Sequence, residues 1–131
     1  MQDLLFVYGT LMRGFDHPMA RLLEDNADFL GEVQCHGRLY LVRHYPGLVD
    51  SNDAGERVHG HLFRLRQPAQ LLAELDDYEG CGADAPPPAE YRRELRTITA
   101  ADGTAQQAWV YLYNWPIDGM PLIAGGRFDL A

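Results

Sequence analysis

An apolar run near the N-terminus is the first element that the hydrophobic pattern predicts. The run covers Asp3–Tyr8 and ends abruptly at Gly9-Thr10, which predicts a buried strand that enters a tight turn. Asp16, followed by His17-Pro18, is typical of a helix N-cap with proline in the first turn. We therefore expect a short helix that begins there and ends near Asn26.

Alternation of apolar and polar positions predicts two strands in the middle of the chain. The alternation is partial over Phe29–Val42, where Gly31 and Gly37 indicate bends in one long strand. Tyr45-Pro46-Gly47 then breaks this pattern. A second alternating run, Val58–Leu65, predicts the next strand.

The clearest helix pattern lies over Pro68–Tyr78. Proline stands at its start, leucines recur at helical spacing, and Gly80 occupies the place of a C-terminal cap. The proline-rich segment Gly82–Glu90 cannot continue this helix. The pattern therefore predicts a helix of three turns followed by an irregular connection.

A hairpin is predicted in the last third of the chain. Strand patterns over Tyr91–Thr99 and Gln107–Tyr113 are separated by the turn signal Asp102-Gly103, and the residues from Asn114 on look irregular. About five or six strands and two short helices result, joined mostly by connections of hairpin length. This organisation favours an α+β fold with a curled or barrel-like sheet over a doubly wound sheet.

Composition and charge narrow the class of protein. The chain has 131 residues, of which 47% are hydrophobic, enough for one domain over residues 1–131 with a core of its own. A formal net charge of −8 repels phosphate backbones and anionic lipids, so we expect neither nucleic acid nor a membrane as partner. No apolar run approaches the roughly 20 residues that cross a bilayer, and the N-terminus lacks a basic signal-peptide region. These features predict a cytoplasmic protein.

The cysteines and histidines predict neither a disulfide nor a metal site. Cys35 and Cys81 are the only cysteines, and we expect both to be reduced thiols. His36 would point to the opposite strand face from Cys35, which argues against a cysteine nucleophile. His59 and His61 share a strand face, but no cysteine or carboxylate is spaced to complete a ligand set. We predict no metal.

Glu79 is the candidate catalytic residue. At about 100° per residue on a helical wheel, with Leu71 at zero, Leu75 lies near 40° and Glu79 near 80°. Asp76 lies on the flank near 140°, and Asp77 faces away near 240°. Burial on the apolar face and the negative end of the helix dipole should both raise the pKa of Glu79.

A carboxyl with a raised pKa suits general acid and base catalysis. The alternative is that Glu79, in the last turn, swings to solvent or pairs with an arginine. The turn Gly9-Thr10-Leu11 offers a complementary element, because successive backbone N–H groups can converge on a carboxylate or an oxyanion. The alternative for this turn is an ordinary loop.

Arg93 is a further candidate binding residue. It shares a strand face with Tyr91 and Leu95, so it emerges beside apolar residues and could hold an anion or pair with Glu79. Arg92, Glu94 and Arg96 on the other face are typical of a solvated surface. The aromatic stripe Trp109, Tyr111 and Tyr113 is typical of core.

Six short motifs together resemble the γ-glutamylcyclotransferase-like family, with its bacterial branch closest. The resemblance covers nearly the whole chain in the right order. The motifs are Val7-Tyr8-Gly9-Thr10-Leu11, Tyr45-Pro46-Gly47, Val58-His59-Gly60, Leu75-Asp76-Asp77-Tyr78-Glu79-Gly80, Tyr91-Arg92-Arg93 and Trp109-Val110-Tyr111. In the tail, Gly126-Arg127-Phe128 stands where similar bacterial proteins usually have Gly-Asp and an aromatic residue.

The resemblance implies a fold, a site and a reaction. The fold is a small closed or nearly closed mixed β-barrel flanked by short helices. The substrate-binding residues are those of the first-strand loop (Tyr8, Gly9, Thr10 and Leu11) together with Tyr91 and Arg93, and Glu79 is the acid/base. The implied reaction cyclises a γ-glutamyl amine or γ-glutamyl peptide to 5-oxoproline, releases the amine and needs no cofactor.

Two other hypotheses remain open. The chain could be a non-catalytic protein that binds a small metabolite in the same cavity, or Glu79 could serve only in a salt bridge. A receptor for an anionic metabolite gains nothing from a buried carboxylate, so the presence of Glu79 favours the enzyme.

Overall fold

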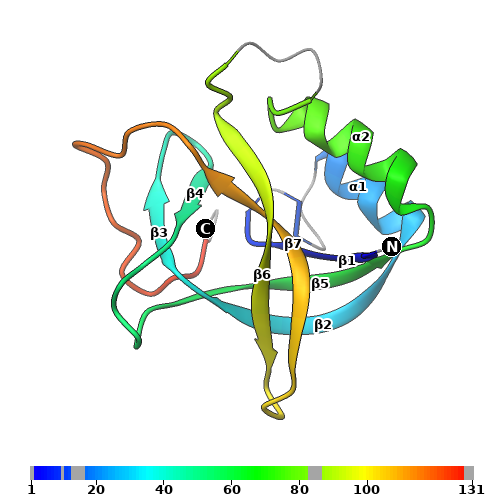
Figure 1. Ribbon diagram of the computed structural model, residues 1–131, viewed down its shortest axis with the longest axis horizontal. Helices are drawn as coiled ribbons and strands as arrows, with labels where there is room; N and C mark the ends of the chain where they lie inside the picture. Colours follow the sequence, from blue (N-terminus) through cyan, green and yellow to red (C-terminus); the bar gives the residue numbers. More distant parts are fainter. Residues whose placement is uncertain (1, 10, 13–16, 83–86, 129–131) are drawn as a thin grey trace.

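Five of the seven strands that the described residues form close into a barrel (Figure 1). The computed structural model describes residues 2–9, 11–12, 17–82 and 87–128. Around the barrel the strands are β1 (Leu4–Val7), β5 (Arg57–Leu65), β2 (Ala27–His36), β6 (Tyr91–Ala100) and β7 (Ala105–Tyr113). Parallel pairing of β1 with β7 completes the ring, whereas the other pairs within it are antiparallel. The predicted α+β fold with a closed mixed barrel is confirmed.

The remaining two strands form a hairpin beside the barrel, and here the prediction of one long strand over Phe29–Val42 is wrong. β2 ends at His36, and β3 (Arg38–Leu41) follows Gly37, where a Cβ atom would lie 2.9 Å from a backbone oxygen of β4. The segment that was expected to break the pattern begins β4 (Pro46–Val49), which pairs with β3. Proline is tolerated there because it is the first residue of the strand.

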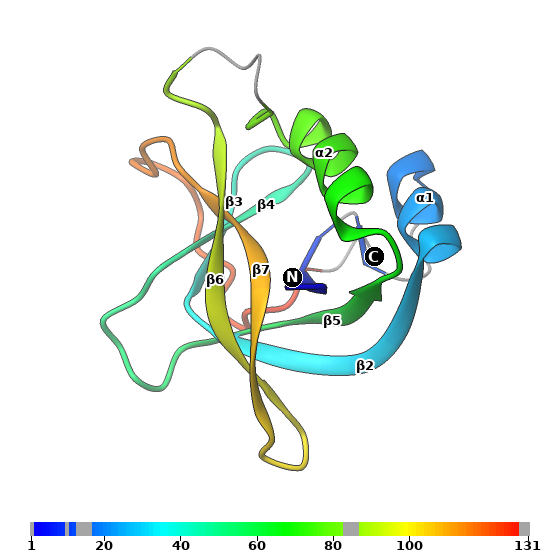
Figure 2. The same ribbon diagram turned by 45° about the vertical axis from the view of Figure 1, so that its right-hand side comes forward.

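Two helices cover one side of the barrel and lie side by side (Figure 2). α1 (Pro18–Asn26) is capped by His17, whose Nδ1 accepts a 3.1 Å hydrogen bond from the Met19 N–H. The expected cap, Asp16, lies outside the described residues, and His17 occupies the N-cap position instead. α2 (Pro68–Tyr78) has the predicted bounds. Among the described residues, no helix is long and apolar enough to cross a membrane.

The core is continuous from the barrel to the helices. Leu5, Phe6 and Leu75 are fully buried, so β1 and α2 contribute to one cluster. Tyr111 and Tyr113 are buried and Trp109 is partly buried, as expected for core residues. Burial of these side chains supplies the main driving force for folding.

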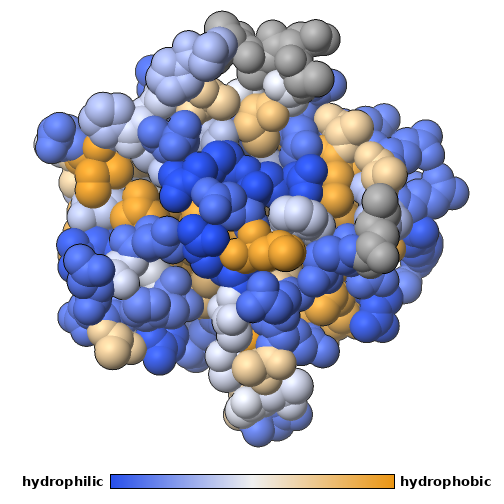
Figure 3. Space-filling model, in the orientation of Figure 1, coloured by the Kyte–Doolittle hydropathy of each residue, from blue (hydrophilic) through white to orange (hydrophobic). Residues whose placement is uncertain are grey.

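The hairpin of β6 and β7 is confirmed, with strand bounds slightly wider than predicted. Arg92, Glu94 and Arg96 form ion pairs with one another and with Asp50. Figure 3 shows mainly hydrophilic residues on the side of the molecule that carries β6. This face of β6 is the solvated surface that the sequence predicts.

The tail after β7 is irregular, as expected, but backbone hydrogen bonds fix it to the barrel. Ile123 N–H donates to Leu39 O over 2.8 Å, and His59 N–H donates to Gly126 O over 2.7 Å. Gly126 has a φ of +66°, and a Cβ atom there would lie 1.9 Å from Arg57 O. Only glycine fits this position.

Candidate active site

A cavity of about 250 Å³ opens between the end of β1, the end of α2 and the start of β6. Its described lining residues are Phe6, Val7, Tyr8, Gly9, Leu11, His17, His44, Tyr45, Pro46, Tyr78, Glu79, Glu90, Tyr91 and Tyr111. The structure therefore brings Tyr8, Gly9, Leu11, Glu79 and Tyr91, five of the seven predicted site residues, into one cavity. Of the other two, Thr10 lies outside the described residues, and Arg93 is not in the lining.

The end of α2 aims Glu79 into this cavity. Glu79 follows the last helical residue but keeps helical backbone angles, and its N–H donates to Leu75 O over 2.9 Å. Gly80 then adopts a φ of +77°, and the N–H groups of Gly80 and Cys81 return to Asp77 O and Asp76 O. This is the Schellman arrangement, which ends the helix with Glu79 as its C-cap residue. The side chain of Glu79 thus stays on the leucine face, as the helical wheel predicts.

The environment of Glu79 favours the protonated carboxyl. The residue keeps part of its surface because the cavity is open, yet protein surrounds the carboxyl almost completely. In the described part of the chain, nothing donates a hydrogen bond to it. Loss of solvation, followed by the negative charges of Glu90 and Asp76, raises the pKa of Glu79 to about 8. The direction of this shift agrees with the expectation from burial on the apolar face of the helix.

The turn after β1 lines the same cavity as Glu79. The Met12 N–H donates to Gly9 O over 3.0 Å and closes a short turn. A Cβ atom on residue 9 would lie 2.9 Å from Cγ of Pro46, so glycine lets the turn pack directly against β4. Gly9 and Leu11 both line the cavity. The backbone of this turn is therefore available at the cavity wall.

The hydroxyl groups of Tyr8 and Tyr91 form hydrogen bonds that connect strands. The Tyr8 hydroxyl donates to Tyr111 O over 2.5 Å and accepts from the Leu48 N–H, which ties β7 to β4. The Tyr91 hydroxyl donates to Pro46 O over 2.7 Å. Burial raises the pKa values of Tyr8 and Tyr91 far above the usual range, so both phenols stay neutral. They offer ring surfaces to a ligand, not titrating groups.

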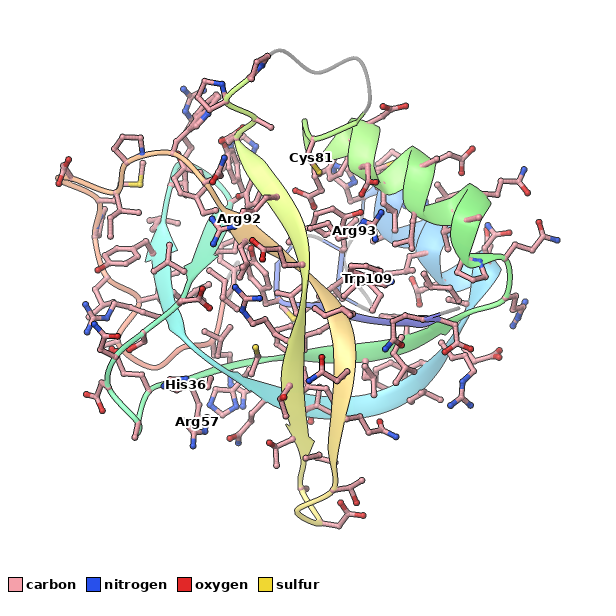
Figure 4. The ribbon with its side chains drawn as sticks, in the orientation of Figure 1. His36, Arg57, Cys81, Arg92, Arg93 and Trp109 are labelled. Carbon is pink, nitrogen blue, oxygen red and sulfur yellow. The ribbon has the colours of Figure 1, made fainter. Side chains whose placement is uncertain are left out.

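Arg93 forms an anchor for α2 outside the cavity. Its guanidinium donates to Asp76 through Nε and Nη2, over 2.8 and 3.1 Å, and lies 4.3 Å from the ring centroid of Trp109. Figure 4 shows Arg93 and Trp109 together on the side of β6 that faces α2, with Arg92 on the other side. The carboxylate of Asp76 also accepts a 2.7 Å hydrogen bond from the Tyr111 hydroxyl.

The alternative that Arg93 pairs with Glu79 is therefore wrong. Asp76 points from the flank of the helix toward the barrel, one turn before Glu79, and takes both hydrogen bonds of the guanidinium. The sequence alone left open whether Arg93 holds an anion or pairs with Glu79, and its partner is the neighbouring carboxylate of Asp76. The consequence is that no arginine accompanies the Glu79 carboxyl within the described residues of the lining.

Sequence reasoning missed the outer part of the cavity. His44, Tyr45 and Glu90 line it, and the Tyr45 hydroxyl donates to Glu90 Oε2 over 2.5 Å. On the opposite wall His17 Nε2 lies 3.2 Å from the Tyr78 hydroxyl. The available signal was Tyr45-Pro46-Gly47, because a break in the pattern between two strands often marks a loop that carries function.

The described residues contain neither a cluster of metal-ligating side chains nor a reactive thiol. Over residues 2–9, 11–12, 17–82 and 87–128, no three His, Cys, Asp or Glu side chains gather closely enough to hold a metal ion. Both cysteines are free, as predicted. Burial raises the pKa values of Cys35 and Cys81 to about 11, so both are protonated thiols at neutral pH.

The chain is similar in sequence to proteins named as γ-glutamylcyclotransferases. The family model described as "Gamma-glutamyl cyclotransferase, AIG2-like" matches residues 5–130. The chain is 37% identical over 125 residues to the Escherichia coli K12 "Gamma-glutamylcyclotransferase family protein YtfP", covering 93% of this chain and 92% of that protein. It is 31% identical to the human "Gamma-glutamylaminecyclotransferase", covering 80% of this chain and 67% of the human protein.

The fold agrees with these relationships. The crystal structure of an AIG2-like protein from Mus musculus superimposes with a TM-score of 0.75 at 26% identity, over 97% of this chain and 88% of the mouse chain. The family model and the superposition both extend over nearly the whole chain. The chain belongs to the γ-glutamylcyclotransferase, AIG2-like family.

Proposed function

We propose that the protein is a γ-glutamylcyclotransferase that converts a γ-glutamyl amine or γ-glutamyl peptide to 5-oxoproline and the free amine. One observation carries the proposal: the Glu79 carboxyl, largely buried and without a hydrogen-bond partner among the described residues, lines the same cavity of about 250 Å³ as the turn after β1. A carboxyl in such surroundings is costly for stability and is typical of functional sites.

The chemistry requires one acid/base group and no second substrate. The α-amino nitrogen of the glutamyl group attacks its own γ-carbonyl carbon, which forms the ring C–N bond and then breaks the C–N bond to the leaving amine. Ionised Glu79 accepts the proton that the attacking nitrogen loses and returns it to the leaving nitrogen. Protons and charges therefore balance within the substrate and Glu79.

The turn after β1 supports the transition state in this proposal. Attack on the γ-carbonyl develops negative charge on its oxygen, and backbone N–H groups at Gly9 and Leu11 are the nearby neutral donors. The rings of Tyr8 and Tyr91 restrict the volume in which the substrate can fold. Since nucleophile and electrophile belong to one molecule, holding the folded conformer supplies a large part of the rate enhancement.

The test is a turnover assay with a matched pair of variants. Wild-type protein is incubated with γ-glutamyl amines and γ-glutamyl dipeptides, and 5-oxoproline is measured. Glu79→Gln removes the proton acceptor and should lower kcat by at least about 100-fold. Glu74→Gln, on the exposed side of the same helix, should keep wild-type activity. Unchanged turnover in Glu79→Gln contradicts the role of Glu79, and binding without turnover favours the non-catalytic hypothesis.

A further inference from the structure

The cavity divides into a buried floor and a more exposed rim. The floor consists of Tyr8, Gly9 and Tyr91, all buried, and the rim consists of His44, which is exposed, and Tyr45 and Glu90, which are partly exposed. The reacting γ-glutamyl group belongs beside Glu79 and the turn after β1, against the floor. The leaving amine then points toward the rim.

Two carboxyl groups and two imidazoles, those of His17 and His44, line this cavity within the described residues. Glu79 and Glu90 are the two carboxyl groups of the lining, and no described lining residue is an arginine. The chain contains no lysine. Arg43 influences Tyr45 electrostatically, but it is exposed and does not line the cavity. A second anionic group on the leaving side would therefore meet repulsion.

Glu90 is held in place at the rim. Its Oε2 accepts the 2.5 Å hydrogen bond from Tyr45, and its backbone oxygen accepts a 2.7 Å hydrogen bond from the Asn114 N–H. No other hydrogen bond to its carboxylate is present among the described residues. One carboxylate oxygen thus remains for a ligand, on a side chain whose position is already fixed.

Three tyrosines, Tyr45, Tyr91 and Tyr113, lie close enough to interact electrostatically with this carboxylate. The ring centroids of Tyr45 and Tyr91 are 6.4 Å apart, and those of Tyr91 and Tyr113 are 5.3 Å apart. A carboxylate together with tyrosine faces is a combination that binds an ammonium group, through a charge-assisted hydrogen bond and cation–π attraction. No arginine accompanies them among the described residues of the lining.

We propose that Glu90, fixed by Tyr45, is a specificity-determining residue that binds a second ammonium group on the leaving amine, so that the preferred substrates are γ-glutamyl conjugates of diamines. This inference rests on the proposed cyclotransferase function, which it refines. A site of this kind distinguishes γ-glutamyl amines from γ-glutamyl dipeptides, because the leaving group of a dipeptide carries a carboxylate.

The experiment compares two uncleaved conjugates that differ in one charge: the mono-γ-glutamyl amide of 1,4-diaminobutane and that of butylamine. Their dissociation constants are measured by calorimetry on Glu79→Gln protein, which binds without turning over. We expect the diamine conjugate to bind about tenfold more tightly, as one partly exposed charge-assisted contact allows. In Glu79→Gln/Glu90→Gln the ratio should fall to near one.

Two controls keep the result specific. Glu79→Gln/Glu74→Gln removes an exposed carboxylate of α2 and should keep the tenfold ratio. Raising the salt concentration should reduce the ratio, since it screens the contact. Equal binding of the two conjugates, or a ratio that survives Glu90→Gln, overturns the role of Glu90. Turnover of the same conjugates by wild-type protein tests the cyclotransferase function separately, because absent 5-oxoproline would contradict that function whatever the binding ratio.

Discussion

Replacing Glu79 by glutamine should stabilise the protein while it removes the proposed activity. The folded protein is more stable when the Glu79 carboxyl is protonated, because loss of solvation and nearby negative charges destabilise the ionised form. With a folded pKa of about 8 and an ordinary value of 4.5, this contribution is fully present below about pH 4.5 and is lost as the pH rises to about 8. Glutamine never ionises, so the stability of the variant does not fall in this way as the pH rises.

The size of the stability gain in Glu79→Gln follows from the pKa shift of Glu79. Each pKa unit corresponds to about 1.4 kcal/mol, so a rise from 4.5 to about 8 sets an upper limit of about 5 kcal/mol above pH 8. Solvent that reaches Glu79 through the cavity reduces this figure. We expect a gain of about 1–3 kcal/mol near pH 9 and almost none near pH 4.5.

Urea denaturation at several pH values measures this difference, with Glu74→Gln as the control for loss of one surface charge. In thermal melts, about 2 kcal/mol corresponds to a Tm increase of roughly 6–10 °C for a domain of this size. A Glu79→Gln protein that is less stable than wild type at alkaline pH, or whose gain does not vary with pH, refutes the reasoning. In that case the carboxyl would have a favourable partner or free access to water.

Three further predictions concern the rate, the anchor of α2 and the turn after β1. Because Glu79 must be ionised to accept a proton, kcat/KM should rise about tenfold per pH unit below its pKa of about 8 and level off above it; a flat profile below pH 8 would contradict the assignment. Arg93→Met should cost about 2 kcal/mol in urea denaturation by leaving Asp76 without its cation, and the double variant with Asp76→Asn should recover part of that loss; strictly additive costs would exclude the pair as an anchor. Gly9→Ala should cost about 1–3 kcal/mol and lower kcat/KM, because its Cβ would crowd Pro46 at 2.9 Å; a variant with wild-type stability and kinetics would show that the turn can shift freely.

Local signals predicted the parts of the fold that depend on one segment. The bounds of α2 followed from proline at one end and glycine at the other, and the hairpin of β6 and β7 followed from its turn residues. The same applies to Glu79, whose direction is fixed by helical geometry and by the positive φ of Gly80. These features need no knowledge of the rest of the chain.

The features that were mispredicted depend on contacts between distant segments. Pro46 begins a strand because β3 and β7 lie beside it, which no pattern within β4 itself reveals. Arg93 pairs with Asp76 and not with Glu79 because of the way α2 packs on the barrel. Glu90 lines the cavity, where its carboxylate accepts a hydrogen bond from Tyr45, a residue 45 positions away in the sequence.

The hydrogen bonds of Tyr8 and Tyr91 have a consequence for how substrate range can change in this family. Each hydroxyl fixes one strand to another, so a substitution at the floor disturbs the barrel and the chemistry together. Among the described residues, the side chains of Tyr45 and Glu90 at the rim hydrogen-bond to each other and not to the backbone of a barrel strand. Selection, in nature or in a library that randomises positions 44, 45 and 90, can therefore alter which amine is released while the cyclising step is preserved.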